Sequence, residues 1–149
     1  MDLVLPQVKD VMSSPMWVIG EEETVGKALA RMRKHNIRRL PVVSGTVKGD
    51  GEPGEGANLV GIITLDEARN AAGDAGEDST EGVHTAMSSP VHTVKAGDLL
   101  DRAVTLMHVH KIAALPVTSY GKLGGMITES DVFRWLAGTL DFEGQASWQ

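Results

Sequence analysis

The stretch Val-Lys-Asp-Val-Met-Ser-Ser-Pro at residues 8–15 recurs as Val-His-Thr-Ala-Met-Ser-Ser-Pro at residues 83–90. The shift is 75 positions, from Met12 to Met87, and it continues through a second set of matches. Ala28, Met32, His35, Ile37, Leu40, Pro41 and Val42 recur as Ala103, Met107, His110, Ile112, Leu115, Pro116 and Val117. Two copies are too few for a solenoid, whose terminal units need neighbours to cover them. The duplication therefore predicts two similar lobes packed on one another, with paired sites between them.

Length and composition limit the possible classes of protein. The 149 residues suffice for one core, whereas each copy alone, at about 60 residues, would be marginal. A net charge of −6 disfavours a general binder of nucleic acid or of anionic membranes. There is no cysteine, which excludes disulfides and thiolate metal sites. No apolar run approaches the roughly 20 residues of a membrane helix, and the first residues do not resemble a signal peptide. We therefore expect a cytoplasmic protein.

Both copies predict the element order β-α-β-β-α. In the first copy, apolar residues at i, i+3, i+4 and i+7 from Val25 indicate an amphipathic helix capped by Thr24. In the second copy the same stripe starts at Leu100, and Asp98 is the expected cap. Strands are expected at 16–19, 39–43, 59–64, 114–118 and 123–128, and closing helices at 65–72 and 129–137. The predicted fold class is α+β, with one copy at 8–72, a linker at 73–82, the other copy at 83–137 and a tail of uncertain order at 138–149.

The first copy carries an insertion that the second copy lacks. Residues 45–58 are rich in glycine and acidic side chains, whereas a tight turn at 120–122 joins the equivalent strands of the second copy. The shift between the copies falls to 64 after this point, from Thr64 to Thr128. Glycine-rich polar segments between strands are typical of loops. We expect residues 45–58 to form a mobile loop.

A candidate ligand site lies where the last strand of each copy meets the last helix. In the second copy, Thr128 precedes the helix and Asp131 follows one turn later. The first amides of a helix can bind an anion, and a carboxylate beside them can accept two hydrogen bonds from a vicinal diol. The same Thr-x-x-Asp spacing is also a common capping arrangement. Both interpretations, a ligand site and a helix cap, stay open at this point.

A second candidate is the basic pair Arg38-Arg39, which directly precedes a strand. Adjacent strand residues point to opposite faces, so at most one of the two is expected to serve a given pocket. The guanidinium group suits phosphate through its fork of donors, although a solvated basic pair at a strand start explains the residues equally well. The second copy has Ala113-Ala114 here, so the basic feature belongs to one copy only.

In their order, these features resemble a CBS domain: Met-Ser-Ser-Pro, an amphipathic helix, Ile-x-x-Leu-Pro-Val, and Gly-x-x-Thr-x-x-Asp. The duplicated arrangement resembles a CBS domain pair, or Bateman module, and it covers residues 8–137. The resemblance implies two tandem repeats packed with pseudo-twofold symmetry. It also implies a regulatory module that binds AMP, ADP, ATP or S-adenosylmethionine in clefts between the repeats. In that family the Thr and Asp of the motif hold ribose and phosphate.

The resemblance assigns residues to two clefts. In the main cleft, Asp131 is expected to hold the ribose, while Thr128 and one arginine hold phosphate. The expected lining of the main cleft is Met16, Trp17, Val18, Arg38, Arg39, Leu40, Pro41, Thr128 and Asp131. The expected lining of the other cleft is Thr64, Glu67, Val91, His92, Thr93, Ala113, Ala114 and Leu115. Because Glu67 replaces the expected Asp and no cation faces it, we expect one good nucleotide site and a second that is weak, empty or differently used.

The histidines indicate structure rather than chemistry. His35 and His110 occupy equivalent positions, which suggests a common structural role. His108 and His110 are two residues apart and do not share a helix face, so no dedicated metal site is expected. The sequence shows no nucleophile–base–acid set and no phosphate-binding Gly-x-x-x-x-Gly-Lys loop, so an enzyme is not expected.

The functional hypothesis is a stand-alone sensor that binds an adenine nucleotide, needs no cofactor and signals to an unknown effector protein in trans. A homodimer is expected, because twofold dimers are the commonest oligomers and CBS pairs associate through their helices. Nucleic acid and membranes are not expected as partners. The alternatives are a ligand-independent dimerisation or protein-interaction module and a CBS pair that binds S-adenosylmethionine.

Overall fold

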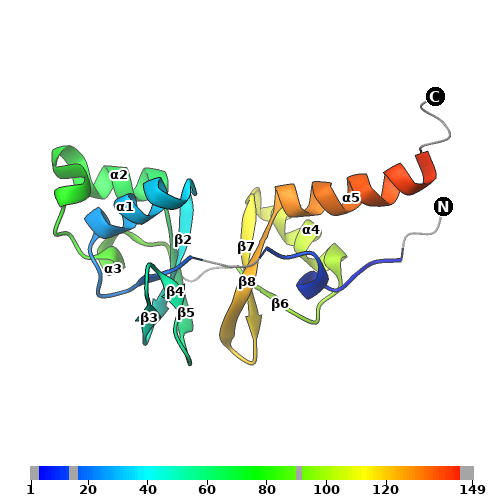
Figure 1. The fold of residues 1–149 in the computed structure, drawn as a ribbon, viewed down its shortest axis with the longest axis horizontal. Coiled ribbons are helices and arrows are strands. Elements are labelled where there is room, and N and C mark those ends of the chain that lie inside the picture. Colours follow the sequence, from blue (N-terminus) through cyan, green and yellow to red (C-terminus); the bar gives the residue numbers. More distant parts are fainter. Residues whose placement is uncertain (1–3, 14–16, 90–91, 145–149) are drawn as a thin grey trace. The chain divides into compact units, whose positions relative to one another are not determined.

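The structure is a computed structural model that describes residues 4–13, 17–89 and 92–144. The chain forms two compact units (Figure 1). The first-repeat unit comprises residues 15–91 and 120–123, and the second-repeat unit comprises residues 1–14, 92–119 and 124–149. The segment that opens each repeat therefore belongs to the unit built around the other repeat.

The first-repeat unit has the predicted order of elements. β1 (Ile19–Gly20) pairs in parallel with β2 (Arg39–Ser44), and β2 pairs in antiparallel fashion with β5 (Asn58–Thr64). α1 (Val25–His35) follows β1, and α2 (Leu65–Ala72) follows β5 without a gap. Thr24 caps α1 as predicted, because its Oγ1 accepts a hydrogen bond of 3.2 Å from the Lys27 amide.

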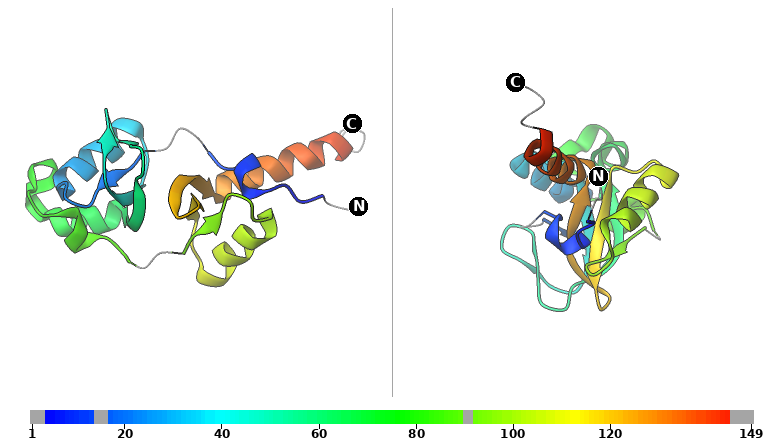
Figure 2. Two further views of the ribbon diagram at one scale, coloured as in Figure 1. Left: turned by 90° about the horizontal axis from the view of Figure 1, so that it is seen from below. Right: turned by 90° about the vertical axis from the view of Figure 1, so that its right-hand side faces the viewer.

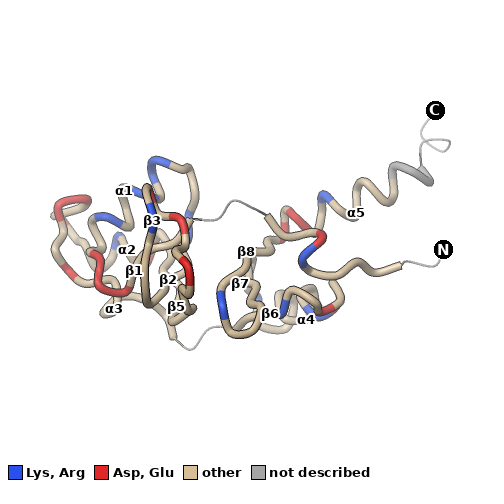
Figure 3. Tube along the Cα trace, turned by 60° about the horizontal axis from the view of Figure 1, so that its bottom comes forward, with Lys and Arg blue, Asp and Glu red and all other residues tan. Residues whose placement is uncertain are grey.

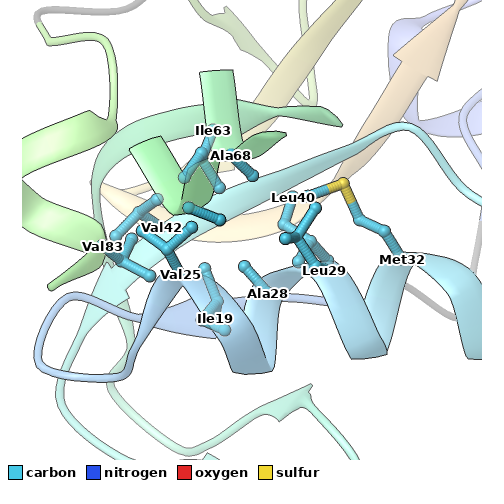
Figure 4. Close-up of a cluster of buried hydrophobic side chains, with 11 residues drawn as sticks. Ile19, Val25, Ala28, Leu29, Met32, Leu40, Val42, Ile63, Ala68 and Val83 are labelled. Carbon is cyan, nitrogen blue, oxygen red and sulfur yellow. The ribbon is translucent and has the colours of Figure 1, made fainter. Parts of the chain in front are cut away.

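The apolar stripe of α1 forms the core of this unit. Figure 4 shows Val25, Ala28, Leu29 and Met32 directed from the helix toward side chains of the sheet. The remaining buried members of the cluster are Ile19, Leu40, Val42, Ile63, Ala68, Ala72 and Val83. Full burial of one large aliphatic side chain contributes about 1.5–3 kcal/mol. The apolar period read from the sequence therefore identifies the face that holds the unit together.

The second-repeat unit repeats this order. β6 (Val94–Lys95) pairs in parallel with β7 (Ala114–Ser119), and β7 lies next to β8 (Lys122–Thr128). α4 (Leu100–His110) and α5 (Glu129–Gly144) are the two helices. The core also contains Val8, from the 3₁₀ helix η1 (Val8–Asp10). The prediction of two β-α-β-β-α repeats in an α+β fold is confirmed.

The predicted cap of α4 is wrong. The N-cap position is Leu99, which makes no side-chain capping bond in the described structure. Asp98 lies one residue too early, and its carboxylate accepts a bond of 2.9 Å from the Lys95 amide instead. A short polar side chain often closes a turn in this way. The Leu100 amide donates to the Pro6 carbonyl at 2.9 Å, so the opening segment satisfies a group that a cap would otherwise serve.

α5 runs to Gly144 and does not end near Ala137 as predicted (Figure 2). Leu136 and Leu140 continue the four-residue spacing that begins at Val132. One internal glycine costs a helix only about 1 kcal/mol, so Gly138 does not end it. The helix therefore continues for seven residues beyond the predicted end at Ala137.

The insertion at 45–58, for which a mobile loop was expected, contains a short hairpin. β3 (Val47–Lys48) and β4 (Glu52–Pro53) pair in antiparallel fashion. The Val18 amide donates to the Gly51 carbonyl at 2.7 Å, and Lys34 pairs with Asp50. Gly51 has φ +122°, and a Cβ there would lie 2.5 Å from the Arg31 side chain. The insertion thus reaches back to the start of the repeat and is held against it.

The predicted linker is also structured. It forms the 3₁₀ helix η2 (Gly73–Asp78) and leads into α3 (Val83–Ala86). Acidic residues gather along it (Figure 3), and Glu77 accepts two bonds from Arg33 at 2.8 and 3.0 Å. A Cβ at Gly26 would lie 2.3 Å from the Glu77 carbonyl oxygen, so α1 and η2 approach closely only because residue 26 is glycine.

Candidate functional site

In the second-repeat unit, the turn between β8 and α5 places an acid at the helix start. Asp131 Oδ2 accepts a hydrogen bond of 2.9 Å from the Thr128 amide. Thr128 Oγ1 accepts one of 3.2 Å from the Asp131 amide, which completes a capping box. Asp131 is only 2% exposed. The capping interpretation of Thr-x-x-Asp therefore holds in this structure, and the ligand-binding role of Asp131 stays a prediction.

Two further donors reach the same carboxylate. Ser13 Oγ donates to Asp131 Oδ1 at 2.5 Å, and Arg134 Nη1 donates to the same oxygen at 3.1 Å. Hydrogen bonds to an ionised carboxylate are shorter and stronger than those between neutral groups. Three donors thus compensate for the burial of this carboxylate.

The first-repeat unit builds the same turn with a longer acid. Glu67 Oε1 accepts from the Thr64 amide at 2.9 Å, and Thr64 Oγ1 accepts from the Glu67 amide at 3.2 Å. Ser88 Oγ donates to Glu67 Oε2 at 2.6 Å. Asn70 stands where the second repeat has Arg134. The extra methylene of glutamate therefore changes neither the cap nor the serine contact.

Each acid receives its serine from a short segment that opens the other repeat. We call residues 12–13 and 87–88 the straps. The Ser13 amide donates to the Met126 carbonyl at 2.9 Å, while Ser88 and Ile62 exchange two backbone bonds of 2.8 and 3.1 Å. A Cβ at Gly125 would lie 2.6 Å from the Met12 sulfur, and one at Gly61 would lie 2.6 Å from the Met87 sulfur. Each strap therefore packs against a strand, β8 or β5, at a glycine that leaves room for the methionine of the strap.

The sequence analysis missed the role of Ser13, Ser88 and Arg134. The repeated Met-Ser-Ser-Pro was a visible signal, because a polar pair recurred at a fixed distance from apolar matches. What the sequence could not show is that this motif contacts the acid of the other repeat.

The basic pair adjoins the turn of its own repeat. Arg39 and Thr64 are partners in the β2–β5 register, and the Leu65 amide donates to the Arg38 carbonyl at 2.8 Å. In the second-repeat unit, the Glu129 amide donates to the Ala113 carbonyl at 2.9 Å. The combination of Arg38–Pro41 with Thr128 and Asp131 in one cleft stays a prediction.

The first-repeat unit contains a pocket of about 500 Å³ at the C-terminal end of α1. Its lining includes Arg33, Arg38 and Arg69 above Leu29 and Met32. Arg38 lines the pocket and Arg39 does not, as expected if neighbouring arginines point to opposite faces.

Two aromatic stacks occupy equivalent places in the two units. Trp17 and His35 stack with ring centroids 3.6 Å apart at 11°, and His92 and His110 stack at 3.8 Å and 18°. The predicted common structural role of His35 and His110 is confirmed. Trp17 and His92, which were expected in the linings of the main and the weaker cleft, each have one ring face on a histidine.

The remaining expected site residues divide into buried and peripheral groups. Val18, Leu40 and Leu115 are fully buried core residues, and Pro41 and Ala114 are also buried. Thr93 and Ala113 are half-buried. Met16 and Val91 lie outside the described residues. That these residues belong to a ligand site stays a prediction.

The charges outside the acid turns lie mainly in the first-repeat unit. Glu23 accepts bonds of 3.2 Å from both terminal nitrogens of Arg31, and its Oε2 accepts one of 2.7 Å from the Gly20 amide. Burial by itself raises the pKa of the Glu23 carboxyl, but the bonds from Arg31 and Gly20 outweigh it and lower the pKa below its usual value. Arg31 also donates to the Val18 carbonyl at 2.9 Å, so this ion pair fixes the chain before β1.

Within residues 4–13, 17–89 and 92–144, no three His, Asp or Glu side chains lie close enough together to bind a metal ion. None of the helices in these ranges combines the length and apolar character needed to cross a bilayer.

Comparisons with known proteins agree with this architecture. The family model described as CBS domain matches residues 8–74 and 83–138. Hypoxic response protein 1 of Mycobacterium tuberculosis is 26% identical over 140 residues, which cover 86% of this chain and 83% of that protein. Inosine-5'-monophosphate dehydrogenase of Staphylococcus haemolyticus is 32% identical over 123 residues, which cover 82% of this chain but only 22% of that enzyme.

Solved structures give the same result. The CBS domain pair of protein MJ0100, in complex with 5'-methylthioadenosine and S-adenosyl-L-methionine, has a TM-score of 0.72 at 26% identity and covers 91% of this chain and 99% of that one. Hypoxic Response Protein I, with two coordinated zinc ions, has a TM-score of 0.71 at 25% identity and covers 87% and 98%. This chain belongs to the CBS domain family, and its two matched repeats form a CBS domain pair.

Proposed function

We propose that this protein is a regulatory sensor whose CBS pair binds an adenine nucleotide, AMP, ADP or ATP, and signals to a partner protein in trans. One observation carries the proposal: both repeats place a carboxylate, from Asp131 or Glu67, beside the first amides of a helix. The adenosine-containing ligands of the MJ0100 pair support it, since a nucleotide shares their ribose.

The chemistry of the turns suits a nucleotide. A carboxylate can accept two hydrogen bonds from the ribose diol, and helix N-termini favour phosphate. Arg38 and Arg39 form no ion pair with the acidic side chains of the described part of the chain, which leaves their guanidinium groups available for phosphate. In the main site we assign ribose to Asp131, phosphate to Thr128 and an arginine, and adenine to the region of Trp17.

S-adenosylmethionine is the second candidate, and the MJ0100 complex favours it. It has the same ribose diol, but its methionine part carries two cationic groups and a single carboxylate in place of the triphosphate, so the arginines contribute less to its binding. Arg38→Ala and Arg39→Ala should therefore weaken ATP binding severalfold and weaken S-adenosylmethionine binding less. Isothermal titration calorimetry with both ligands measures this difference, and Arg102→Ala on α4 is the matched control.

A homodimer is part of the proposal. The second-repeat unit exposes apolar side chains on α4 and α5, with Phe133 65% and Val109 63% exposed. Such surfaces often mark contacts with a partner. If the clefts bind nothing, this surface favours the alternative of an interaction module that needs no ligand.

A thermal-shift screen tests the proposal. A ligand at a hundred times its Kd stabilises the folded state by about 2.7 kcal/mol. We expect millimolar AMP, ADP or ATP to raise the melting temperature, and Asp131→Ala to abolish the shift more completely than Glu67→Ala. The absence of any shift with all three nucleotides would rule out the nucleotide sensor, and a shift with S-adenosylmethionine alone would identify the second candidate.

A further inference from the structure

The acid of each turn is already bound to a hydroxyl group of the protein. Ser13 Oγ lies 2.5 Å from Asp131 Oδ1, and Ser88 Oγ lies 2.6 Å from Glu67 Oε2. Both serines are exposed, whereas Asp131 is 2% exposed and Glu67 is half-buried. Each serine therefore stands on the solvent side of its acid.

The two oxygens of each carboxylate have different tasks. One oxygen caps the helix through the Thr128 or Thr64 amide, and its loss would leave that amide without its partner. The other oxygen accepts the serine hydroxyl. In the second repeat, the same oxygen also accepts from the exposed Arg134. A ligand hydroxyl that approaches this oxygen from solvent therefore competes with the serine for it.

We propose that Ser13 and Ser88 are positioning residues that compete with the ligand for the two acids. One hydroxyl of a vicinal diol takes the position of the serine, and the second hydroxyl donates to the remaining lone pair of the capping oxygen. The diol therefore forms two hydrogen bonds for the one that the acid loses. A molecule with a single hydroxyl replaces the serine–acid hydrogen bond by one hydrogen bond of its own, so it gains little binding free energy. The serines thereby make each acid selective for ribose-like diols. This inference rests on the proposed function and adds a competitor to its site.

Displacement of the serine by a ligand would also affect how the strap is attached to the rest of its unit. Ser13 belongs to a strap whose amide is bonded to the Met126 carbonyl and whose methionine lies against Gly125. The same strap leads back to Val8 in the core of the second-repeat unit. Loss of the side-chain bond weakens one end of this attachment, so ligand binding changes the stability of the strap.

The occurrence of the contact in both repeats argues against chance. The acids differ in length, and the sequences that precede the straps differ at most positions. Nevertheless, the serine–acid distance, the backbone bond and the methionine–glycine contact are all repeated. A role in the helix cap alone would not require them, because the threonine already completes each capping box.

Calorimetric titration of AMP, ADP, ATP and S-adenosylmethionine into four proteins tests the proposal. These are the wild type, Ser13→Ala, Ser88→Ala and the double variant. Because a hydrogen bond to a charged group no longer has to be broken, we expect the affinity of the turn whose serine is removed to rise about tenfold, for the ligand that binds the wild type. A loss of structure cannot produce a rise in affinity, so the sign of the effect separates competition from damage.

Two controls make the result specific. Ser89→Ala changes the next serine of the same motif, which makes no side-chain hydrogen bond in the described part of the chain, and should leave the affinity unchanged. Ser88→Thr keeps a hydroxyl group and should keep the wild-type affinity. A tightening by Ser89→Ala as large as that by Ser88→Ala would contradict the assignment.

The outcomes also distinguish this inference from the proposed function. If the wild type binds a ligand but the alanine variants bind it equally or less tightly, competition by the serines is disproved and the sensor stands. If only the double variant binds, the serines compete as proposed and block the wild-type site. If none of the four proteins binds any of the four ligands, both proposals fail.

Discussion

The two acid turns resemble each other more closely than their sequences suggest, and they differ in their surroundings. Asp131 and Glu67 make the same cap and the same serine contact, although one side chain is longer. Arg134 adds a charged donor to Asp131, whereas Arg38 and Arg39 adjoin the Glu67 turn without an ion pair to it in the described structure. The two repeats therefore share the structure of the turn but differ in the positions of the cations around it.

The helices that cover the two units differ in a second way. α1 is covered by η2, and Gly26 allows the close approach. In the second repeat Asp101 stands at the position equivalent to Gly26, and α4 exposes Val104 and Val109. In the first-repeat unit, the linker therefore covers a face of α1. In the second-repeat unit, α4 keeps exposed apolar side chains.

Removal of the two acids should give the largest and most unequal effects. Asp131→Ala leaves a buried amide and a guanidinium group without their acceptor, and we expect a loss of about 3 kcal/mol in the free energy of unfolding. Glu67→Ala removes a less buried acid with two side-chain contacts and should cost about 1–2 kcal/mol. Urea unfolding measures both, with the exposed Asp66→Ala as control. Equal losses in the free energy of unfolding would contradict the expectation that the more buried Asp131, with its additional donor Arg134, stabilises the protein more than Glu67 does.

The covered helix offers the next test. Gly26→Ala forces a Cβ against the backbone of η2, and we expect a destabilisation of about 1–3 kcal/mol. The equivalent change in the second repeat, Asp101→Ala, affects an exposed position and should stay within about 0.5 kcal/mol. Thermal unfolding of the two variants provides the measurement. A neutral Gly26→Ala would mean that η2 does not pack on α1 as described.

The helix caps should give a smaller difference. Thr24→Ala removes the bond to the Lys27 amide and should cost about 1 kcal/mol. Leu99 has extended backbone angles at the N-cap of α4, so Leu99→Ser can add a cap and stabilise the protein by about 0.5 kcal/mol. Chemical denaturation of both variants tests this pair, and a stabilising Thr24→Ala would contradict it.

The acid-dependent effect should be the smallest. The pKa of the Glu23 carboxyl lies below its usual value of 4.5, because hydrogen bonds from Arg31 and Gly20 outweigh burial. The folded state therefore gains stability from ionised Glu23 above pH 4.5 and loses it as the pH falls through the folded-state pKa. Glu23→Gln should reduce the pH dependence of the free energy of unfolding below pH 5. An unchanged dependence would show that Glu23 does not contribute to it.

The sequence predicted what local periodicity determines. The stripe from Val25 identified α1 and its buried face, and the strands expected at 39–43 and 59–64 are present as β2 and β5. Thr24 was a reliable cap because its signal lies within one turn of the helix it starts. The duplication made these predictions stronger, because the same element was expected at the equivalent place in the other copy.

The sequence failed where distant segments meet. Asp98 closes a turn because the Pro6 carbonyl already accepts from the start of α4. The insertion at 45–58 gains its structure from Val18 and Lys34, which are remote in sequence. The bond from Ser13 to Asp131 spans most of the chain. No local pattern contains these contacts.

A ¹⁵N-correlated NMR titration with AMP, ADP, ATP and S-adenosylmethionine directly tests the proposal that the acid turns bind an adenosine ligand. We expect saturable shifts of amides in at least one turn, Thr64–Glu67 or Thr128–Asp131, together with shifts of the Ser13 or Ser88 amide in the corresponding strap. Saturable shifts confined to other parts of the chain, or no shifts at millimolar concentrations of all four ligands, would contradict it.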